Sequence, residues 1–284
     1  MARQLIECVP NFSEGRDTAV VLAIEQAIGA VPGVVLLQKD MDPDHNRSVI
    51  TFAGAREAVG EAAMRGIAMA VERIDLRQHS GVHPRIGAAD VVPFVPLESA
   101  TLEDCTGLAH EVGKAVWENL GVPVYFYEAA AATPERAPLE KIRRGGFEHP
   151  ALAPDLGGSG LHPTAGACAI GARMLLVAFN VNLNSGDLAI AKSIARKIRA
   201  SSGGLPFVKA MGVPLASRGL VQVSMNLTNF EATPLSSVMA AVRAEASALG
   251  VDIAGTEIVG LAPRKALVGY EDIYADRILE DHLG

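Results

Sequence analysis

Cysteine and aromatic residues are scarce in this chain. Its 284 residues include three cysteines, one tryptophan and four tyrosines. Cys8, Cys105 and Cys168 lie far apart, without the paired spacing of a zinc site, and an odd number does not describe a disulfide scaffold. We therefore expect a protein of the reducing cytoplasm that holds no metal.

Positive charge and long apolar runs are also lacking. Lys and Arg number 25 against 32 Asp and Glu, which gives a formal net charge of −7 and no overall basic field for nucleic acid or an anionic membrane. The longest charge-free run, residues 156–172, is shorter than a membrane span and is broken by glycine and proline. The N-terminus has neither the hydrophobic region nor the cleavage site of a secretion signal. We expect a cytoplasmic protein with no nucleic-acid or membrane partner.

Apolar residues recur at regular spacing throughout the first half of the chain. Apolar residues make up 49% of the sequence, which excludes intrinsic disorder. Short apolar runs typical of strands alternate with segments whose apolar residues repeat at helical spacing. Their order is strand, helix, two strands, helix, strand. We expect these elements at residues 5–9, 17–31, 34–37, 49–52, 55–74 and 91–95. Thr101 and Asp104 then form a capping-box pattern for a helix to residue 120, before a strand at 122–127.

The second half repeats this order. We expect strands at residues 174–183, 207–213, 220–227 and 251–261, and helices at 187–199 and 233–250. The pattern predicts an α+β protein of two ferredoxin-like βαββαβ lobes, residues 1–172 and 173–284, with mixed or antiparallel sheets covered by helices. Residues 150–166, rich in glycine and proline, are typical of a linker or crevice-lining segment between the lobes. Pro93 and Pro96 favour an edge position or a bulge for the strand at 91–95.

Residues 79–85, with the sequence HSGVHPR, hold two of the seven histidines. Gly81 and Pro84 oppose the continuous helix that would bring both imidazoles to one metal ion. The functional interpretation is one imidazole that acts as general base and acid near neutral pH, with Arg85 holding an anion. The alternative is a loop histidine that only hydrogen-bonds to the backbone.

A second polar cluster lies at residues 40–47. Its three aspartates lack the spacing and the closing glutamate of a calcium-binding EF-hand loop. The segment is either a solvated turn or the source of a carboxylate that orients a histidine from the next loop.

Residues 157–166 form a glycine-rich stretch. It lacks the Lys-Ser/Thr ending of a P-loop and the glycine spacing of a dinucleotide fingerprint. Two interpretations stay open: a flexible linker, or a segment whose backbone approaches a planar ligand closely because glycine has no Cβ.

Longer motifs resemble a known family. They are ECVPNFSEG at residues 7–15, Asn46-Arg47 and HSGVHPRIGAADV at 79–91, and the likeness continues as far as residue 261. Together they resemble glutamate formimidoyltransferase, the folate-dependent enzyme of histidine degradation. The resemblance implies transfer of a formimino group from N-formimino-L-glutamate to N5 of tetrahydrofolate, with tetrahydrofolate as co-substrate and a homodimer as the assembly. The chain has no room for a cyclodeaminase half, so the product is expected to pass to a separate cyclodeaminase.

The resemblance also implies site residues. His83 corresponds to the catalytic histidine, and Asp40 to an acid near it. Arg47 and Arg85 are our candidates for binding the substrate carboxylates. The folate-binding stretch corresponds to Gly157, Gly158, Ser159, Gly160, Leu161, His162, Pro163, Thr164, Ala165 and Gly166.

Two other functions stay open on the sequence. The same histidine chemistry would serve a transferase or hydrolase acting on the formyl group of 5-formyltetrahydrofolate or N-formylglutamate. Ferredoxin-like lobes also form regulatory modules, so a non-catalytic folate-binding module is the alternative from a different class. Comparing donors at equal concentration separates the formimino enzyme from the formyl enzyme, and folate binding without turnover of any donor would favour the binding module.

Overall fold

The computed structural model describes residues 4–158 and 160–283. The chain divides into two compact units, and the division falls between Met174 and Leu175. Each unit has its own sheet, helices and apolar core, so the mixed α+β class is confirmed. Within the described ranges, no helix is long and apolar enough to cross a membrane.

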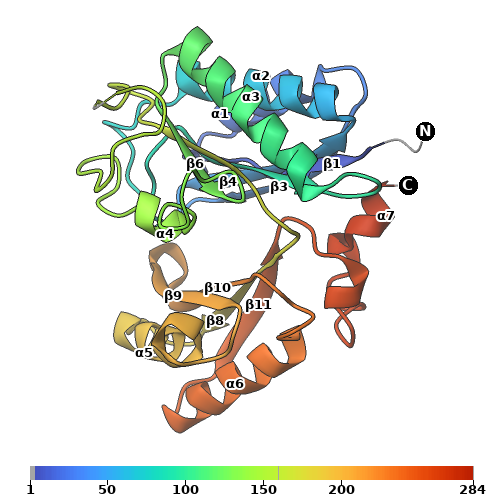
Figure 1. The fold of residues 1–284 in the computed structure, drawn as a ribbon. Coiled ribbons are helices and arrows are strands. Elements are labelled where there is room, and N and C mark those ends of the chain that lie inside the picture. Colours follow the sequence, from blue (N-terminus) through green and yellow to red (C-terminus); the bar gives the residue numbers. More distant parts are fainter. Residues whose placement is uncertain (1–3, 159, 284) are drawn as a thin grey trace. The chain divides into compact units, whose positions relative to one another are not determined.

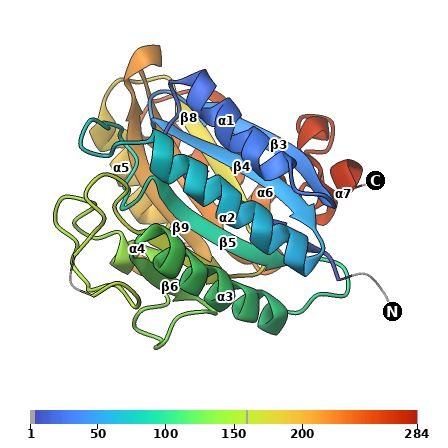
Figure 2. The same cartoon turned by 90° about the horizontal axis from the view of Figure 1, so that it is seen from above.

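The first unit is built on a seven-stranded sheet. Its strands are β1 (Ile6–Cys8), β2 (Asn11–Phe12), β3 (Val34–Asp42), β4 (Arg47–Gly54), β5 (Ala89–Pro96), β6 (Val124–Glu128) and β7 (Cys168–Ala172). Its helices are α1 (Thr18–Gly29), α2 (Arg56–Arg73), α3 (Leu102–Leu120) and the short α4 (Leu139–Ile142). Both β1 and β2 pair antiparallel with β4 and β5, so together they behave as one strand interrupted at Val9 and Pro10. Figures 1 and 2 show α1, α2 and α3 on the same face of this sheet.

The helices of the first unit begin where the sequence predicts. The Asp17 carboxylate accepts hydrogen bonds from two backbone N–H groups at the start of α1. Thr101 and Asp104 form the expected capping box at the start of α3. Because α1 turns its apolar residues at helical spacing toward the sheet, Val21, Ile24 and Ile28 are fully buried.

The sequence favours an edge position or a bulge for the strand that contains Pro93, and the edge position is wrong. The register of this strand against β2 does shift close to Pro93, where Asn11 pairs with Val91 and Phe12 with Ala89. This strand, β5, lies in the middle of the sheet, between the β1–β2 pair and β7. The Pro93 carbonyl accepts from the Val9 N–H, so the side of Pro93 that lacks an N–H faces the interruption between β1 and β2. A proline is tolerated at this place because the neighbouring strand has a gap there.

Two further expectations for the first unit need correction. Strand β3 continues through Asp40 to Asp42, where the sequence suggests a polar loop, because it pairs with β4 as far as Arg47. The stretch before residue 167 is not a linker between units. It leads into β7, a strand unrecognised in the sequence, which lies between β5 and β6 in the first sheet and pairs with both in parallel.

The second unit has a four-stranded antiparallel sheet in the order β11-β8-β10-β9. Its strands are β8 (Val177–Leu183), β9 (Val208–Leu215), β10 (Leu220–Leu227) and β11 (Ile253–Val259). Its helices are α5 (Leu188–Ile198), α6 (Leu235–Ala248) and α7 (Leu279–Leu283), with short 3₁₀ helices η1 (Ala200–Ser202), η2 (Ala216–Arg218), η3 (Arg264–Ala266) and η4 (Ala275–Arg277). The caps and strands that the sequence predicts are present, including Asp187 at the start of α5.

Residues along β8 alternate between the two faces of the second sheet. Phe179 and Val181 join the apolar core, whereas Asn180 and Asn182 belong to the opposite face. On that face the Gln222 side-chain amide donates to Asn182 at 2.9 Å and to Glu257 at 2.8 Å. Asn180 donates to the same Glu257 carboxylate oxygen at 3.1 Å. The second unit therefore carries a buried network of amides around one carboxylate.

Candidate active site

A small pocket in the first unit gathers side chains from segments that are far apart in the sequence. It is lined by Ser13, His45, Asn46, Arg47, His79, His83, Pro84, Arg85 and Asp90. These residues come from the segment after β2, the turn between β3 and β4, the start of β4, the loop between α2 and β5, and β5 itself. The fold therefore brings together three residues that the sequence singles out: His83, Arg47 and Arg85.

The His83 ring is held by a hydrogen bond at each nitrogen. Its Nδ1 lies 2.9 Å from the Pro84 carbonyl oxygen, which only accepts. Its Nε2 lies 2.5 Å from Nη1 of Arg47, which only donates. Both contacts are satisfied by one tautomer, in which Nδ1 carries the hydrogen and Nε2 has the lone pair. The imidazole is therefore neutral, and its basic atom is Nε2.

Electrostatics favour the same neutral state. Burial, followed by the positive charges of Arg47 and Arg143, holds the pKa of His83 well below its usual value of 6.5. Burial also lowers the pKa of Arg47 to about 9, so that the guanidinium still carries its charge at neutral pH. The pocket thus pairs an unprotonated base with a buried cation.

Two more histidines line this pocket. The His45 ring stacks on His83 with the ring centroids 5.8 Å apart. The His79 Nε2–H donates to the Asn46 carbonyl oxygen at 2.9 Å, which leaves Nδ1 as an acceptor. That Nδ1 is buried and has no hydrogen-bond partner among the described residues. Burial lowers the pKa of His79, so this second ring is also favoured in its neutral form.

Asn46 fastens the histidine loop to the turn between β3 and β4. Its backbone is in the left-handed region, with a φ of 49°, which asparagine adopts more readily than most residues. Its side chain accepts from the Gly15 N–H at 3.0 Å and donates to the Ser80 carbonyl at 2.9 Å. Since the His79 ring also donates to its carbonyl oxygen, Asn46 joins three segments around the pocket.

Asp90 supports the same loop from β5. One of its carboxylate oxygens accepts from the Ile86 N–H at 2.8 Å, and the other pairs with the guanidinium of Arg143, which follows α4. The Asp90 side chain is buried. Neither Asp90 nor Arg143 is among the site residues that the sequence predicts. Asp90 lies inside the HSGVHPRIGAADV motif, which is a usable signal, but nothing in the sequence connects Arg143 to it.

Arg85 is already partnered on one side of its guanidinium. Its Nη2 donates to the His79 carbonyl at 3.0 Å and to the Glu148 carboxylate at 2.9 Å. The Nε atom of Arg85 is buried and has no acceptor among the described residues. The Arg85 side chain is 15% exposed, whereas Glu148 is 51% exposed. A mostly buried cation is thus covered by a carboxylate from the surface.

Part of the glycine-rich stretch is fixed against the histidine loop. The Ala88 N–H donates to the Ala165 carbonyl, and Gly166 forms a β-bridge with Gly87. Gly166 has a φ of +69°, and a Cβ there would lie 2.1 Å from the Ile86 carbonyl oxygen, so only glycine fits. The backbone at this end of the stretch therefore lies directly beside the loop that carries His83.

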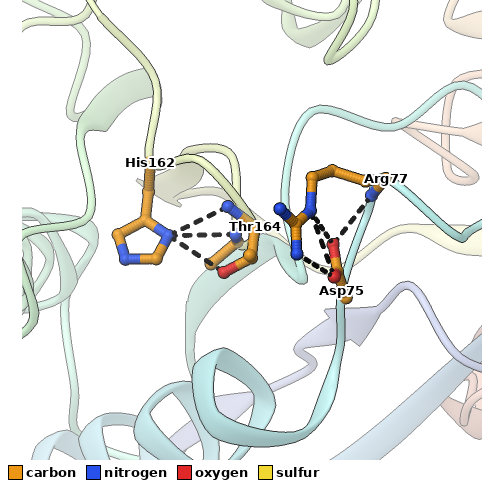
Figure 3. Close-up of polar contacts among 5 residues, drawn as sticks. Asp75, Arg77, His162 and Thr164 are labelled. Carbon is orange, nitrogen blue, oxygen red and sulfur yellow. Dashed lines mark hydrogen bonds and ion pairs between the residues drawn. The ribbon is translucent and has the colours of Figure 1, made fainter.

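The His162 ring closes the turn in this stretch. Its Nδ1 accepts from the Ala165 N–H at 3.0 Å, and Figure 3 shows the ring turned toward Thr164. The Thr164 carbonyl also accepts from the Leu76 N–H, which ties the turn to the segment after α2, where Asp75 and Arg77 form an ion pair. His162 thus orders the turn through its own ring.

The other candidate residues lie outside the pocket lining. Asp40 is on β3 opposite Val49. The Ala165 side chain is in the apolar core of the first unit and Leu161 packs against a smaller apolar cluster, while Ser159 lies outside the described residues. Gly157, Gly158, Gly160 and Pro163 belong to the same stretch, in which Gly160 and Pro163 are exposed. No group of three side chains that could hold a metal ion occurs in residues 4–158 and 160–283.

Comparison with known sequences decides the family. Residues 5–173 match the formiminotransferase domain, N-terminal subdomain, and residues 178–280 match the formiminotransferase domain. The chain belongs to the formiminotransferase family. This membership covers both units, with the His83 pocket in the part that matches the N-terminal subdomain.

Relatives from distant organisms extend this match over almost the whole chain. The glutamate formimidoyltransferase of Streptococcus pyogenes serotype M1 is 43% identical over 99% of this chain and 99% of its own length. That of Thermoplasma acidophilum is 48% identical over 95% of this chain and 92% of its own length. The mouse formimidoyltransferase-cyclodeaminase is 42% identical over 96% of this chain, which spans 53% of that protein. All three are formiminotransferases by name.

Proposed function

We propose that this protein is a glutamate formimidoyltransferase that moves the formimino group from N-formimino-L-glutamate to N5 of tetrahydrofolate. The observation that carries the proposal is the neutral His83 ring, held between Pro84 and Arg47 in the pocket of a formiminotransferase chain. A neutral imidazole near physiological pH both accepts and returns a proton, which is what this transfer requires.

The proton transfers of this reaction require a group that both accepts and releases a proton. N5 of tetrahydrofolate is a secondary amine that forms a bond to the formimino carbon and then loses its proton. His83 Nε2 takes that proton. The same proton passes to the glutamate nitrogen as its bond to the formimino carbon breaks. One imidazole in this position therefore serves as base and then as acid, and ends the cycle unchanged.

Arg47 has a part in starting this cycle. Its guanidinium donates to the Nε2 lone pair that the mechanism uses, so Arg47 has to turn away before His83 can act. A buried guanidinium strongly favours a hydrogen-bonded anion, and both substrates carry carboxylates. We infer that a substrate carboxylate attracts Arg47 and thereby frees the base.

The remaining assignments are parts of the same proposal. The backbone of residues 162–166 lies beside the His83 loop, which supports a role in binding the flat pterin ring of tetrahydrofolate. Asp40, on β3, is proposed as the acid that acts near the catalytic histidine. The homodimer stays a prediction, checked by analytical ultracentrifugation, as does the cytoplasmic location. Because both units match formiminotransferase domains, we propose that neither unit carries out the cyclodeaminase step that consumes the product.

We also infer that each unit is a ferredoxin-like lobe. In the second sheet the four strands of the βαββαβ order are arranged fourth, first, third, second. The same arrangement is found in the first sheet when β1 and β2 count as one strand and β6 and β7 as additions to its edge. Division after Met174 supports lobes close to residues 1–172 and 173–284.

Turnover by the purified protein tests the proposed function. With tetrahydrofolate and N-formimino-L-glutamate, we expect formation of 5-formiminotetrahydrofolate and L-glutamate. N-formylglutamate and 5-formyltetrahydrofolate, supplied at equal concentration, should be much poorer substrates. Faster turnover of either formyl compound would replace the proposal by a formyl transferase or hydrolase. Folate binding without turnover of any of them would favour a binding module.

A further inference from the structure

The contact between Glu148 and Arg85 has the chemistry of a bound substrate group. Glu148 Oε1 lies 2.9 Å from Arg85 Nη2 at the pocket that contains His83. The two substrates named above both carry glutamyl carboxylates: the donor is a glutamate derivative, and tetrahydrofolate ends in a glutamate tail. A glutamate side chain presents the same carboxylate on the same carbon chain.

The contact is weaker than the one a substrate would make. Glu148 engages Arg85 through Nη2 alone, and Nε of Arg85 is buried without an acceptor. A carboxylate that binds a guanidinium edge-on accepts from Nε and Nη2 together and gains a second charge-assisted bond. Glu148 is half-exposed, so solvent screens the charge that it brings to Arg85. The Arg85 guanidinium is therefore able to bind a carboxylate that enters the pocket more strongly than it binds Glu148.

We propose that Glu148 occupies the subsite for a glutamyl carboxylate of a substrate on Arg85 and leaves when that carboxylate binds. The inference rests on the proposed function, which supplies the identity of the substrates. It names Arg85 as the anchor of the carboxylate and Glu148 as the group that competes for it.

The local backbone allows this exchange without unfolding. Backbone hydrogen bonds from Gly146 to Arg143, from His149 to Gly145 and from Ala151 to Arg144 hold the segment that carries Glu148. None of them uses the Glu148 side chain, so its carboxylate can turn into solvent while the segment stays in place. Gly146, with a φ of +66°, lets the segment pass close to Arg85.

Steady-state kinetics of Glu148→Gln test the inference. Removal of a competing carboxylate should lower KM for one of the two substrates by about 2- to 5-fold, the range expected when an ion pair that is screened on one side by solvent is lost. A lower KM for N-formimino-L-glutamate assigns the subsite to the donor. A lower KM for tetrahydrofolate assigns it to the glutamate tail, and tetrahydropteroate, which lacks that tail, should then show no change.

Three further variants separate competition from other effects. Glu148→Asp keeps the negative charge but shortens the side chain, so competition predicts a lower KM here too, whereas a long-range charge effect predicts the wild-type value. Glu111→Gln removes one partner of an exposed pair with Arg56 elsewhere in the unit and should leave KM unchanged. In an Arg85→Gln background, Glu148→Gln should have no effect on KM.

Two outcomes would overturn the inference. An unchanged KM in Glu148→Gln means that Glu148 does not compete, and a raised KM means that it helps to position Arg85. Calorimetric binding of L-glutamate to the wild type and to Glu148→Gln provides a readout that is independent of turnover. If the wild type fails to transfer the formimino group, the proposed function fails, while tighter glutamate binding by the variant would still support the subsite.

Discussion

The two units share an order of strands and helices but differ in the segments that connect them. In the first unit the connection from α2 to β5 runs from Ile74 to Ala88 and carries His79, His83 and Arg85. In the second unit the corresponding connection, from α6 to β11, runs only from Leu249 to Asp252. Loops on a rigid scaffold tolerate insertion better than the scaffold itself, so chemistry accumulates in them. One scaffold thus has a long connection with the candidate site residues in one unit and a minimal connection in the other.

The two units also differ in the kinds of polar residue that they contain. Six of the seven histidines in the sequence precede Met174, and only His282 follows it. The second unit instead buries amides around Glu257, in which Asn180 and Gln222 donate to the Glu257 carboxylate and Gln222 also donates to Asn182. Side-chain amides do not ionise near neutral pH, whereas imidazoles do. This difference supports the proposal that the first unit supplies the proton transfer.

The largest effect that tests this comparison is expected when one histidine in each unit is replaced. His83→Ala should reduce kcat for formimino transfer by about 100- to 10,000-fold, because it removes the only group assigned to move the proton. His282→Ala, in α7 of the second unit, should leave kcat within about 2-fold of the wild type. Circular dichroism checks that both variants fold. Comparable activity in the two variants would remove the catalytic distinction between the units.

Buried and exposed ion pairs give the next test. Asp90→Ala leaves Arg143 without its buried partner and the Ile86 N–H without its acceptor, and should lower the free energy of unfolding by about 3–5 kcal/mol. Urea unfolding followed by Trp117 fluorescence measures it, because this one tryptophan lies on α3 of the first unit.

The matched control for Asp90 lies in the second unit. Glu231 pairs there with Lys265, and both side chains are more than 60% exposed, at 66% and 62%. Glu231→Ala should therefore cost less than about 1 kcal/mol, measured by circular dichroism. Equal losses in the two variants would show that burial does not distinguish these pairs.

Glu7 makes the stability of the first unit depend on pH. Burial raises the pKa of Glu7 from 4.5 to about 7, with Arg173 opposing the shift. The folded state therefore holds the proton more tightly than the unfolded chain, so its stabilising effect is complete below pH 4.5 and is lost as pH rises through 7. Glu7→Gln should stabilise the protein by about 2 kcal/mol more at pH 8 than at pH 5, by Trp117 fluorescence.

An exposed acid in the same unit is the control for Glu7. Glu118 is 57% exposed on α3, and Glu118→Gln should change the free energy of unfolding by less than about 0.5 kcal/mol at both pH values. A pH-independent effect of Glu7→Gln would mean that the buried carboxyl is not the source of the dependence.

The smallest effect is expected in the pH profile of Arg47→Gln. Removal of this guanidinium takes away one of the charges that lower the pKa of His83, so that pKa should rise toward 6.5. Since the base acts when unprotonated, kcat/KM at pH 6 relative to pH 8 should fall by about 2- to 4-fold compared with the wild type. Arg65→Gln, on the exposed surface of α2, should keep the wild-type profile. An unshifted acid limb in Arg47→Gln would exclude its effect on the base.

Local signals account for the parts of the fold that could be predicted. Asp17, Thr101 and Asp187 cap helices by contacts within a few residues, so their sequence context is sufficient. Pro93 misleads because its tolerance in β5 depends on the gap beside Val9, on another strand. Strand β7 escapes notice because alanine and glycine carry little strand preference, and its pairing with β5 and β6 stabilises it.

Sequence patterns are enough to predict the α+β class and the order of the elements apart from β7, and the family resemblance points to His83 as the catalytic histidine. The protonation and charge pairing around this histidine follow from tertiary contacts instead. The contacts from His83 to Arg47, from Asp90 to Arg143 and from Arg85 to Glu148 join residues far apart in the chain. The burial that lowers the pKa of His83 also comes from such distant segments. Sequence patterns record what neighbouring residues favour, whereas protonation and charge pairing depend on what folding brings together.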